Sequence, residues 1–134
     1  MSINIRPFQK EDFRTIHQLI SEAFNVSKYH PLQNSFLEQN HIHSFVAMEN
    51  EIIVGTATLH LIYKTNRIMG LIEDVVIAPH AQGKGIGKAL VLHLVEQSKS
   101  LGCYKTMLNA AAKNISFYEK MGLEVGEYQM VIRH

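Results

Sequence analysis

One stretch constrains this chain more than any other, because an apolar run, a glycine-rich loop and an amphipathic segment follow one another over residues 72–101. Residues 72–78 are apolar and rich in β-branched side chains, a composition typical of a buried strand. Between residues 86 and 94 apolar side chains recur every four positions, which predicts a helix. Gly102 stands where a left-handed residue often ends a helix. The stretch therefore predicts a strand–loop–helix unit.

The loop of this unit, residues 82–88, carries three glycines and two lysines where the helix must begin. A helix start offers unpaired N–H groups and a partial positive charge, and glycine lets the main chain approach a phosphate closely. Two known phosphate-binding patterns do not fit. Ala89 stands where a P-loop needs Ser or Thr, and Lys88 and Leu90 stand where the dinucleotide pattern needs its third glycine. The alternative to a phosphate-binding loop is a glycine-rich turn that only starts a helix.

The composition fits a chain of 134 residues that forms one globular domain, which we expect over residues 1–134. The net charge of +1, with no basic stripe, argues against a nucleic-acid partner. No apolar run approaches the roughly 20 residues of a membrane span, and no secretory signal opens the chain. We therefore expect no membrane partner and a cytoplasmic protein.

The other segments alternate between strand and helix patterns. We expect the element order β-α-α-β-β-β-α-β-α-β in a mixed α/β domain with no repeats or linkers. Besides the central unit, the expected strands cover residues 3–7, 44–48, 52–63, 104–108 and 125–133, and the expected helices cover residues 11–24, 32–39 and 114–121.

The loop pattern Gln-x-x-Gly-x-Gly, at Gln82, Gly85 and Gly87, resembles the diphosphate-binding loop of the GNAT superfamily of acyl-CoA N-acyltransferases. Four further stretches are similar to glucosamine-6-phosphate N-acetyltransferases: residues 72–76, 102–105, 114–122 and 130–133. The resemblance covers about residues 52–133. It implies the GNAT fold and an N-acetyltransferase that uses acetyl-CoA without a metal or a covalent enzyme intermediate. It also implies a homodimer in which the last strand joins the partner.

Amide formation from a thioester needs a group that accepts the proton of the attacking amine, which is mostly protonated at pH 7. Glu73 and Asp74 are adjacent acids in an apolar strand, so their side chains are expected on opposite faces. We expect Glu73 to be the base and Asp74 to bind substrate. The alternatives are a water or backbone base, or two inert acids at a strand end.

The leaving thiolate needs a proton donor, and Tyr118 matches the tyrosine that often fills this role in the superfamily. A packed tyrosine with its hydroxyl bonded to backbone is the alternative. The resemblance implies that Arg133 grips a sugar phosphate, for which a planar, permanently charged guanidinium is suited. It also implies coenzyme contacts from one strand, the loop and one asparagine: Val75, Val76, Ile77, Gln82, Gly83, Lys84, Gly85, Ile86, Gly87, Lys88 and Asn114.

Several alternatives stay open at this stage. Asn114 could be only a helix cap, and the two lysines could be only solvated. The short segment 64–67 and the alanine-rich segment 109–113 depart from the sugar-phosphate enzymes. Glucosamine 6-phosphate is therefore the leading acceptor, beside a polyamine, an amino acid or a protein α-amine. The alternative outside the enzymes is a non-catalytic domain that binds or senses acyl-CoA.

Metal and covalent chemistry have little support in the sequence. Among eight histidines only His41 and His43 form a close pair, and no cysteine or carboxylate cluster completes a site, so no metal is expected. The single Cys103 has no evident histidine partner for nucleophilic catalysis.

Overall fold

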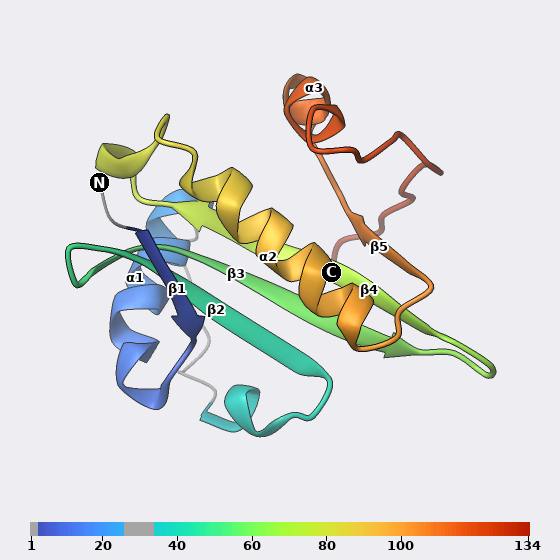
Figure 1. Cartoon of the computed structure of the whole chain (residues 1–134), viewed down its shortest axis with the longest axis horizontal. Helices are drawn as coiled ribbons and strands as arrows, with labels where there is room; N and C mark the ends of the chain where they lie inside the picture. The colour runs from blue at the N-terminus through green and yellow to red at the C-terminus, as the bar shows by residue number, and fades with distance from the viewer. Residues whose placement is uncertain (1–2, 26–33) are drawn as a thin grey trace.

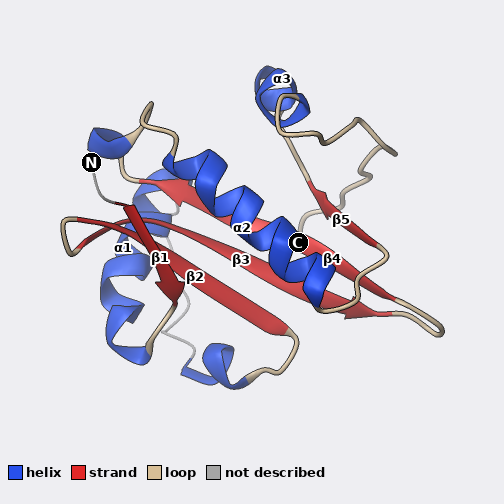
Figure 2. Cartoon of the chain, viewed as in Figure 1, coloured by secondary structure: helices blue, strands red, loops and turns tan. Residues whose placement is uncertain are grey.

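A five-stranded sheet forms the centre of the computed structural model, which describes residues 3–25 and 34–134 (Figure 1). The strands are neighbours in chain order, and every adjacent pair is antiparallel except the last, which is parallel. The mixed sheet with helices confirms the expected fold class (Figure 2). The strands are β1 (Ile3–Pro7), β2 (Ile42–Glu49), β3 (Ile52–Tyr63), β4 (Ile68–Ile77) and β5 (Lys105–Leu108).

Helices cover both faces of this sheet. The α-helices are α1 (Phe13–Phe24), α2 (Ile86–Ser100) and α3 (Ile115–Glu119). Short 3₁₀ helices cover Lys10–Asp12, Asn34–Glu38, Pro79–Ala81 and Ala112–Asn114.

Adjacent residues of β2 show how the two long helices are placed. Phe45 and Ala47 belong to the core cluster that holds the buried leucines of α2, whereas Val46 packs with Ile16 of α1. Successive side chains of a strand point to opposite faces, so α2 and α1 lie on opposite faces of the sheet. The core on the α2 face is the larger of the two.

The β2–β3 hairpin has the tight turn expected at Asn50 and Glu51. Both residues are left-handed, with φ of 51° and 66°. A two-residue turn with two positive φ angles matches the right-handed twist of the paired strands. Asn tolerates this conformation better than most residues other than Gly, which explains how the turn forms without the usual Asn-Gly pair.

Helix α2 ends as expected, at a left-handed glycine. Gly102 has φ of 88°, its N–H donates to Lys99 C=O at 3.1 Å, and Cys103 N–H donates to Ser98 C=O at 3.1 Å. This pair of bonds is the Schellman motif, which satisfies the last carbonyls of a helix. The chain then turns directly into β5.

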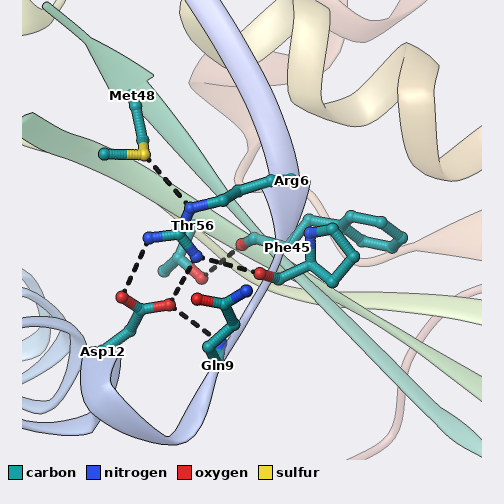
Figure 3. Close-up of polar contacts among 7 residues, drawn as sticks. Arg6, Gln9, Asp12, Phe45, Met48 and Thr56 are labelled. Carbon is teal, nitrogen blue, oxygen red and sulfur yellow. Dashed lines mark hydrogen bonds and ion pairs between the residues drawn. The ribbon is translucent and has the colours of Figure 1, made fainter. Parts of the chain in front are cut away.

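An arginine on β1 fastens the start of α1 to the sheet edge (Figure 3). Arg6 donates two hydrogen bonds to the Asp12 carboxylate, at 2.7 and 3.0 Å, and Gln9 N–H donates a third at 2.8 Å. The bonds from Arg6 are the main reason that the pKa of Asp12 lies below its ordinary value. The carboxylate therefore stays charged and holds the β1–α1 connection.

Two expected elements differ in the structure. Residues 124–134, here called the C-terminal segment, are exposed and form no strand, so the strand expected over residues 125–133 is wrong for the single chain. Among residues 3–25 and 34–134 the segment finds no sheet partner, because β5 pairs only with β4 in the described sheet. The helix expected over residues 32–39 is a 3₁₀ helix over Asn34–Glu38, and residues 32–33 lie outside the described residues.

Candidate active site

A β-bulge in β4 lies directly beside the two predicted site carboxylates. Thr58 of β3 pairs with Glu73, but Thr56 pairs with Val76, so the single residue between the two threonines faces both Asp74 and Val75. Asp74 takes the left-handed conformation, with φ of 54°. The bulge adds one residue to the strand and breaks the side-chain alternation. The simple alternation expected for Glu73 and Asp74 therefore does not hold at this point.

The edge of β4 beyond the bulge has no neighbouring strand within the described chain. β5 pairs with β4 from Met69 to Ile72 only, whereas β4 continues to Ile77. Figure 1 shows β5 leading away from β4 toward α3. Residues 73–77 therefore present an edge without a strand partner in the described chain, to which an extended ligand can bond as an added strand. The predicted coenzyme contacts Val75, Val76 and Ile77 lie on this edge.

The glycine-rich loop lies between β4 and α2, and the N-terminus of α2 at its end has no side-chain cap. Gly83 and Gly85 have φ of 79° and 84°, and a Cβ at either would meet no atom within 4 Å. Glycine is therefore required here by backbone conformation rather than by crowding. The first backbone bond of α2 runs from Ala89 N–H to Gly85 C=O at 3.0 Å, so the amides of residues 86–88 have no acceptor within the helix.

Two side chains of the loop reach back to the sheet. Gln82 Nε2 donates to Ile77 C=O at 3.2 Å, and Lys84 Nζ lies 3.2 Å from Glu49 Oε1. Lys88 is exposed, as are residues 83–85. These residues form an open, amide-rich surface, which is the kind of site that holds phosphate. The Glu49 contact was not expected from the sequence, because 35 positions separate its two residues.

Tyr118 lies on α3 and packs against the core on the α2 face. Its side chain is half-buried, and this burial raises the pKa of the phenol above its ordinary value, so the phenol is protonated at neutral pH. Within the described residues its hydroxyl makes no hydrogen bond, unlike the backbone-bonded tyrosine considered above. Tyr118 also lines a cavity of about 310 Å³ between α3, the end of β5 and the C-terminal segment.

Helix α3 lies beside both the loop and the end of β4. A Cβ built on Gly87 would lie 3.6 Å from Ile77 Cγ1 and 4.0 Å from Phe117 Cζ. The rings of Phe117 and Tyr118 are in edge contact, with centroids 5.1 Å apart. The structure therefore brings together the start of α2, the free edge of β4 and the predicted acid on α3.

The two predicted carboxylates have different surroundings. Glu73 is half-buried and shares the sheet face of its partner Thr58, which is the face opposite α2. Asp74 is open to solvent on one side, but surrounding atoms bury it enough to raise its pKa, against a smaller opposite effect of His60. The predicted base and the predicted acid Tyr118 therefore lie on opposite faces of the sheet.

The remaining predicted site residues are exposed. Asn114 stands at the N-cap of α3, but its side chain makes no capping hydrogen bond, so the helix-cap alternative does not explain this residue. Arg133 lies in the C-terminal segment and has no ion-pair partner within the described chain. Its role as a phosphate ligand stays a prediction. Within residues 3–25 and 34–134, no three His, Cys, Asp or Glu side chains form a group that could hold a metal.

The fold and these surfaces define a class of protein: an α/β domain that can hold an extended ligand along a free strand edge, with the ligand's phosphates at a helix start. The chain belongs to the acetyltransferase (GNAT) family, whose model matches residues 10–123. The family resemblance seen in the loop and the strand before it is thereby confirmed.

The relatives described next are all named for the same activity. A glucosamine 6-phosphate N-acetyltransferase from Trypanosoma brucei brucei is 46% identical over 81 residues, which are 58% of this chain and 55% of that protein. A glucosamine 6-phosphate N-acetyltransferase from Candida albicans is 31% identical over 92% of this chain and 76% of its own length. The crystal structure of glucosamine-6-phosphate N-acetyltransferase from Arabidopsis thaliana is 28% identical and superimposes with a TM-score of 0.87 over 99% of both chains. The match to the Trypanosoma relative thus spans about half of that protein.

Proposed function

We propose that this chain is an acetyl-CoA-dependent N-acetyltransferase that acetylates a primary amine of a small molecule, with glucosamine 6-phosphate as the leading acceptor. The observation that carries the proposal is the free β4 edge, residues 73–77, which leads into an open glycine loop at the start of α2. A pantetheine arm can bond along the edge while the diphosphate of the coenzyme meets the loop amides. The names of the relatives support both the reaction and the acceptor.

The reaction proceeds by direct attack. The acceptor reacts as its neutral amine, after the ammonium has released one proton to solvent. The amine nitrogen bonds to the thioester carbonyl carbon, the C–S bond breaks, and one further proton leaves the nitrogen while one joins the sulfur. Glu73 accepts the first proton, and Tyr118, whose pKa is raised by burial, donates the second. Because these residues lie on opposite sheet faces, amine and coenzyme approach from opposite sides of the β4 edge. A backbone N–H of residues 75–77 polarises the carbonyl.

The acceptor is bound by Asp74 and Arg133 in this proposal. Asp74 lies at the bulge, one residue from the predicted base, where its carboxylate can bond an amine or a sugar hydroxyl. Arg133 supplies a fixed positive charge for a phosphate. Since Arg133 stands in the exposed C-terminal segment, it reaches an acceptor when that segment is docked.

We further propose a homodimer in which the C-terminal segment pairs with a second copy. The segment carries apolar side chains that one chain leaves open: Tyr128 and Met130 are each 92% exposed, and Ile132 is 84% exposed. The outer edge of β5 is unpaired in the described sheet. Apolar side chains beside an unpaired strand edge are a common basis for association. Light scattering should give the mass of a dimer, and a chain that ends at Leu123 should give that of a monomer.

The activity is tested by thiol release from acetyl-CoA with a panel of amines. Turnover with glucosamine 6-phosphate, and little with glucosamine, supports the phosphate-bearing acceptor. Turnover only with a polyamine, an amino acid or a peptide α-amine moves the chain to another acceptor within the family. Calorimetric binding of acetyl-CoA with no turnover on any amine supports the non-catalytic acyl-CoA-binding rival, and no binding of acetyl-CoA refutes the proposal.

Two organisational expectations remain proposals. The described residues contain no helix long and apolar enough to cross a membrane. A cytoplasmic location is proposed from the sequence and is tested by cell fractionation. A single domain over residues 1–134 is tested by limited proteolysis, which should leave one resistant core.

A further inference from the structure

An ion pair joins the glycine-rich loop, residues 82–88 (the proposed coenzyme loop), to the C-terminal end of β2. Lys84 Nζ lies 3.2 Å from Glu49 Oε1 and 3.5 Å from Glu49 Oε2. The Glu49 side chain is only 13% exposed, whereas that of Lys84 is 38% exposed. Within the described residues, Glu49 has no other cationic partner, so the lysine is its counter-charge.

The backbone of the loop does not depend on this ion pair. Gly83 and Gly85, on either side of Lys84, hold the left-handed conformations that shape the loop. Gln82 independently bonds the loop to Ile77 C=O at 3.2 Å. Loss of the Glu49 charge would therefore free the ammonium of Lys84 and leave the amide surface in place.

The carboxylate and an incoming diphosphate compete for the same cation. A partly exposed ion pair is weak and is readily broken by a ligand with more negative charge. Glu49 also places a fixed negative charge beside a site that would take a polyanion, and this charge opposes binding. Both effects act in the same direction and lower the affinity for the coenzyme.

We propose that Glu49 is a positioning residue that withholds Lys84 from the coenzyme diphosphate and so weakens coenzyme binding and speeds release of product CoA. The inference rests on the proposed function, because it needs the loop to be the diphosphate site. Glu49 acts mainly through Lys84, with a smaller contribution from its own charge, and in this proposal it touches neither the coenzyme nor the acceptor. Its effect should therefore fall on affinity for CoA rather than on the chemical step.

Calorimetry with CoA on the full chain tests the inference through Glu49→Gln. At low salt we expect the variant to bind CoA about two- to fivefold more tightly than the unchanged protein, the range of an exposed ion pair. At about 1 M salt the difference should shrink, because the Debye length is then about 3 Å. Glu51→Gln, on the adjacent turn, makes the same charge change without a Lys84 contact and should leave the affinity unchanged.

A double-mutant cycle identifies Lys84 as the route of the effect. Lys84→Met should weaken CoA binding, and Glu49→Gln in the Lys84→Met background should recover clearly less affinity than it adds in the unchanged protein. An equal gain in both backgrounds would overturn the role of Lys84. Unchanged or weaker binding by Glu49→Gln would overturn the inference, and weaker binding would show that the pair orders the loop instead.

Two controls separate the possible failures. If the unchanged protein does not bind CoA at all, the proposed function fails; if it binds and Glu49→Gln does not differ, only this inference fails. Thermal unfolding of each variant checks the fold, and Glu49→Ala offers a second neutral side chain if the glutamine variant is unstable. In steady state, Glu49→Gln should lower KM for acetyl-CoA, and kcat should fall only where CoA release limits turnover.

Discussion

Ser98 Oγ of α2 accepts a hydrogen bond of 2.7 Å from Thr106 Oγ1 of β5, directly above Gly70 of β4. The absence of a side chain at Gly70 allows the helix to lie this close to the sheet. A Cβ at Gly70 would clash with Ser98 Oγ and would lie 3.0 Å from Leu59 Cδ1. This contact sets the distance between α2 and β4, the two elements that flank the glycine-rich loop.

Gly70→Ala should lower the free energy of unfolding by about 1–3 kcal/mol, the usual range for overpacking a tight core. Urea unfolding measures the change. Gly126→Ala is the matched control, because a Cβ there meets nothing within 4 Å and should change stability by less than about 0.5 kcal/mol. Ser98→Ala in the Gly70→Ala background should recover part of the loss, since it removes the clashing oxygen. Equal stability of the two glycine variants would contradict the packing argument.

Tyr118→Phe should lower kcat roughly 100-fold or more, because a general acid typically contributes at least that factor. The phenylalanine ring keeps the packing of α3, so KM for acetyl-CoA should change little. Since burial raises the pKa of Tyr118 above its ordinary value of 10.0, the midpoint of any activity loss through this group should lie above pH 10. Tyr63→Phe is the control, as Tyr63 is 65% exposed at the end of β3 and should tolerate the loss of its hydroxyl. An unchanged rate in Tyr118→Phe would remove the proposed acid.

Asp74→Asn should make the protein more stable at neutral pH than the unchanged chain. The folded pKa of Asp74 lies above its unfolded value of 3.8, so folding favours the protonated form. The difference between the two proteins should therefore be smallest below pH 3.8 and should grow as pH rises through the folded pKa. Urea unfolding at several pH values measures it.

The conformation of Asp74 supplies the control for that experiment. Its φ of 54° suits Asn but not Ala, so Asp74→Ala should lose about 1–2 kcal/mol of stability relative to Asp74→Asn. If Asp74 binds the acceptor, Asp74→Asn should also raise KM for the amine and leave KM for acetyl-CoA unchanged. A pH-independent difference in stability would contradict the assigned burial of this carboxylate.

One of the five tyrosines should titrate with a pKa of about 8. Tyr104 is exposed, and two nearby cations stabilise its phenolate and so lower its pKa. The larger effect comes from Arg67, whose guanidinium lies 4.8 Å from the ring centroid. The smaller effect comes from Lys64, whose Nζ lies 3.3 Å from the hydroxyl. Absorbance at the phenolate band should show this step in the unchanged protein and lose it in Tyr104→Phe. Arg67→Met should raise the pKa.

The lowered pKa of Tyr104 also predicts how the free energy of unfolding changes with pH. The folded pKa of Tyr104 lies below its ordinary value of 10.0, so the stabilising effect is present above pH 10 and is lost as pH falls through about 8. Lys113→Met, a control on a lysine with no contact to Tyr104, should leave the titration unchanged. A single transition near pH 10 for all tyrosines would contradict the arrangement around Tyr104.

The sequence by itself determined the strand–loop–helix unit and the family. Glycine at residues 83 and 85, the helix-ending Gly102 and the four-residue periodicity of α2 act on their own neighbours, so their effect can be predicted without knowing the rest of the fold. The same locality makes the motif around Gln82 recognisable in a single chain.

Only the tertiary structure decided what depends on distant pairing. The bulge at Asp74 arises from the register between β3 and β4, and the free edge of residues 73–77 arises because β5 leaves β4 after Ile72. The contact of Glu49 with Lys84 joins positions 35 residues apart. The C-terminal segment has the pattern of a strand but no strand partner in the part of the chain that the structure describes. A strand pattern in the sequence predicts which side chains alternate between the two faces. The register, the free edges and the partners of a strand depend on the other strands and helices that pack beside it.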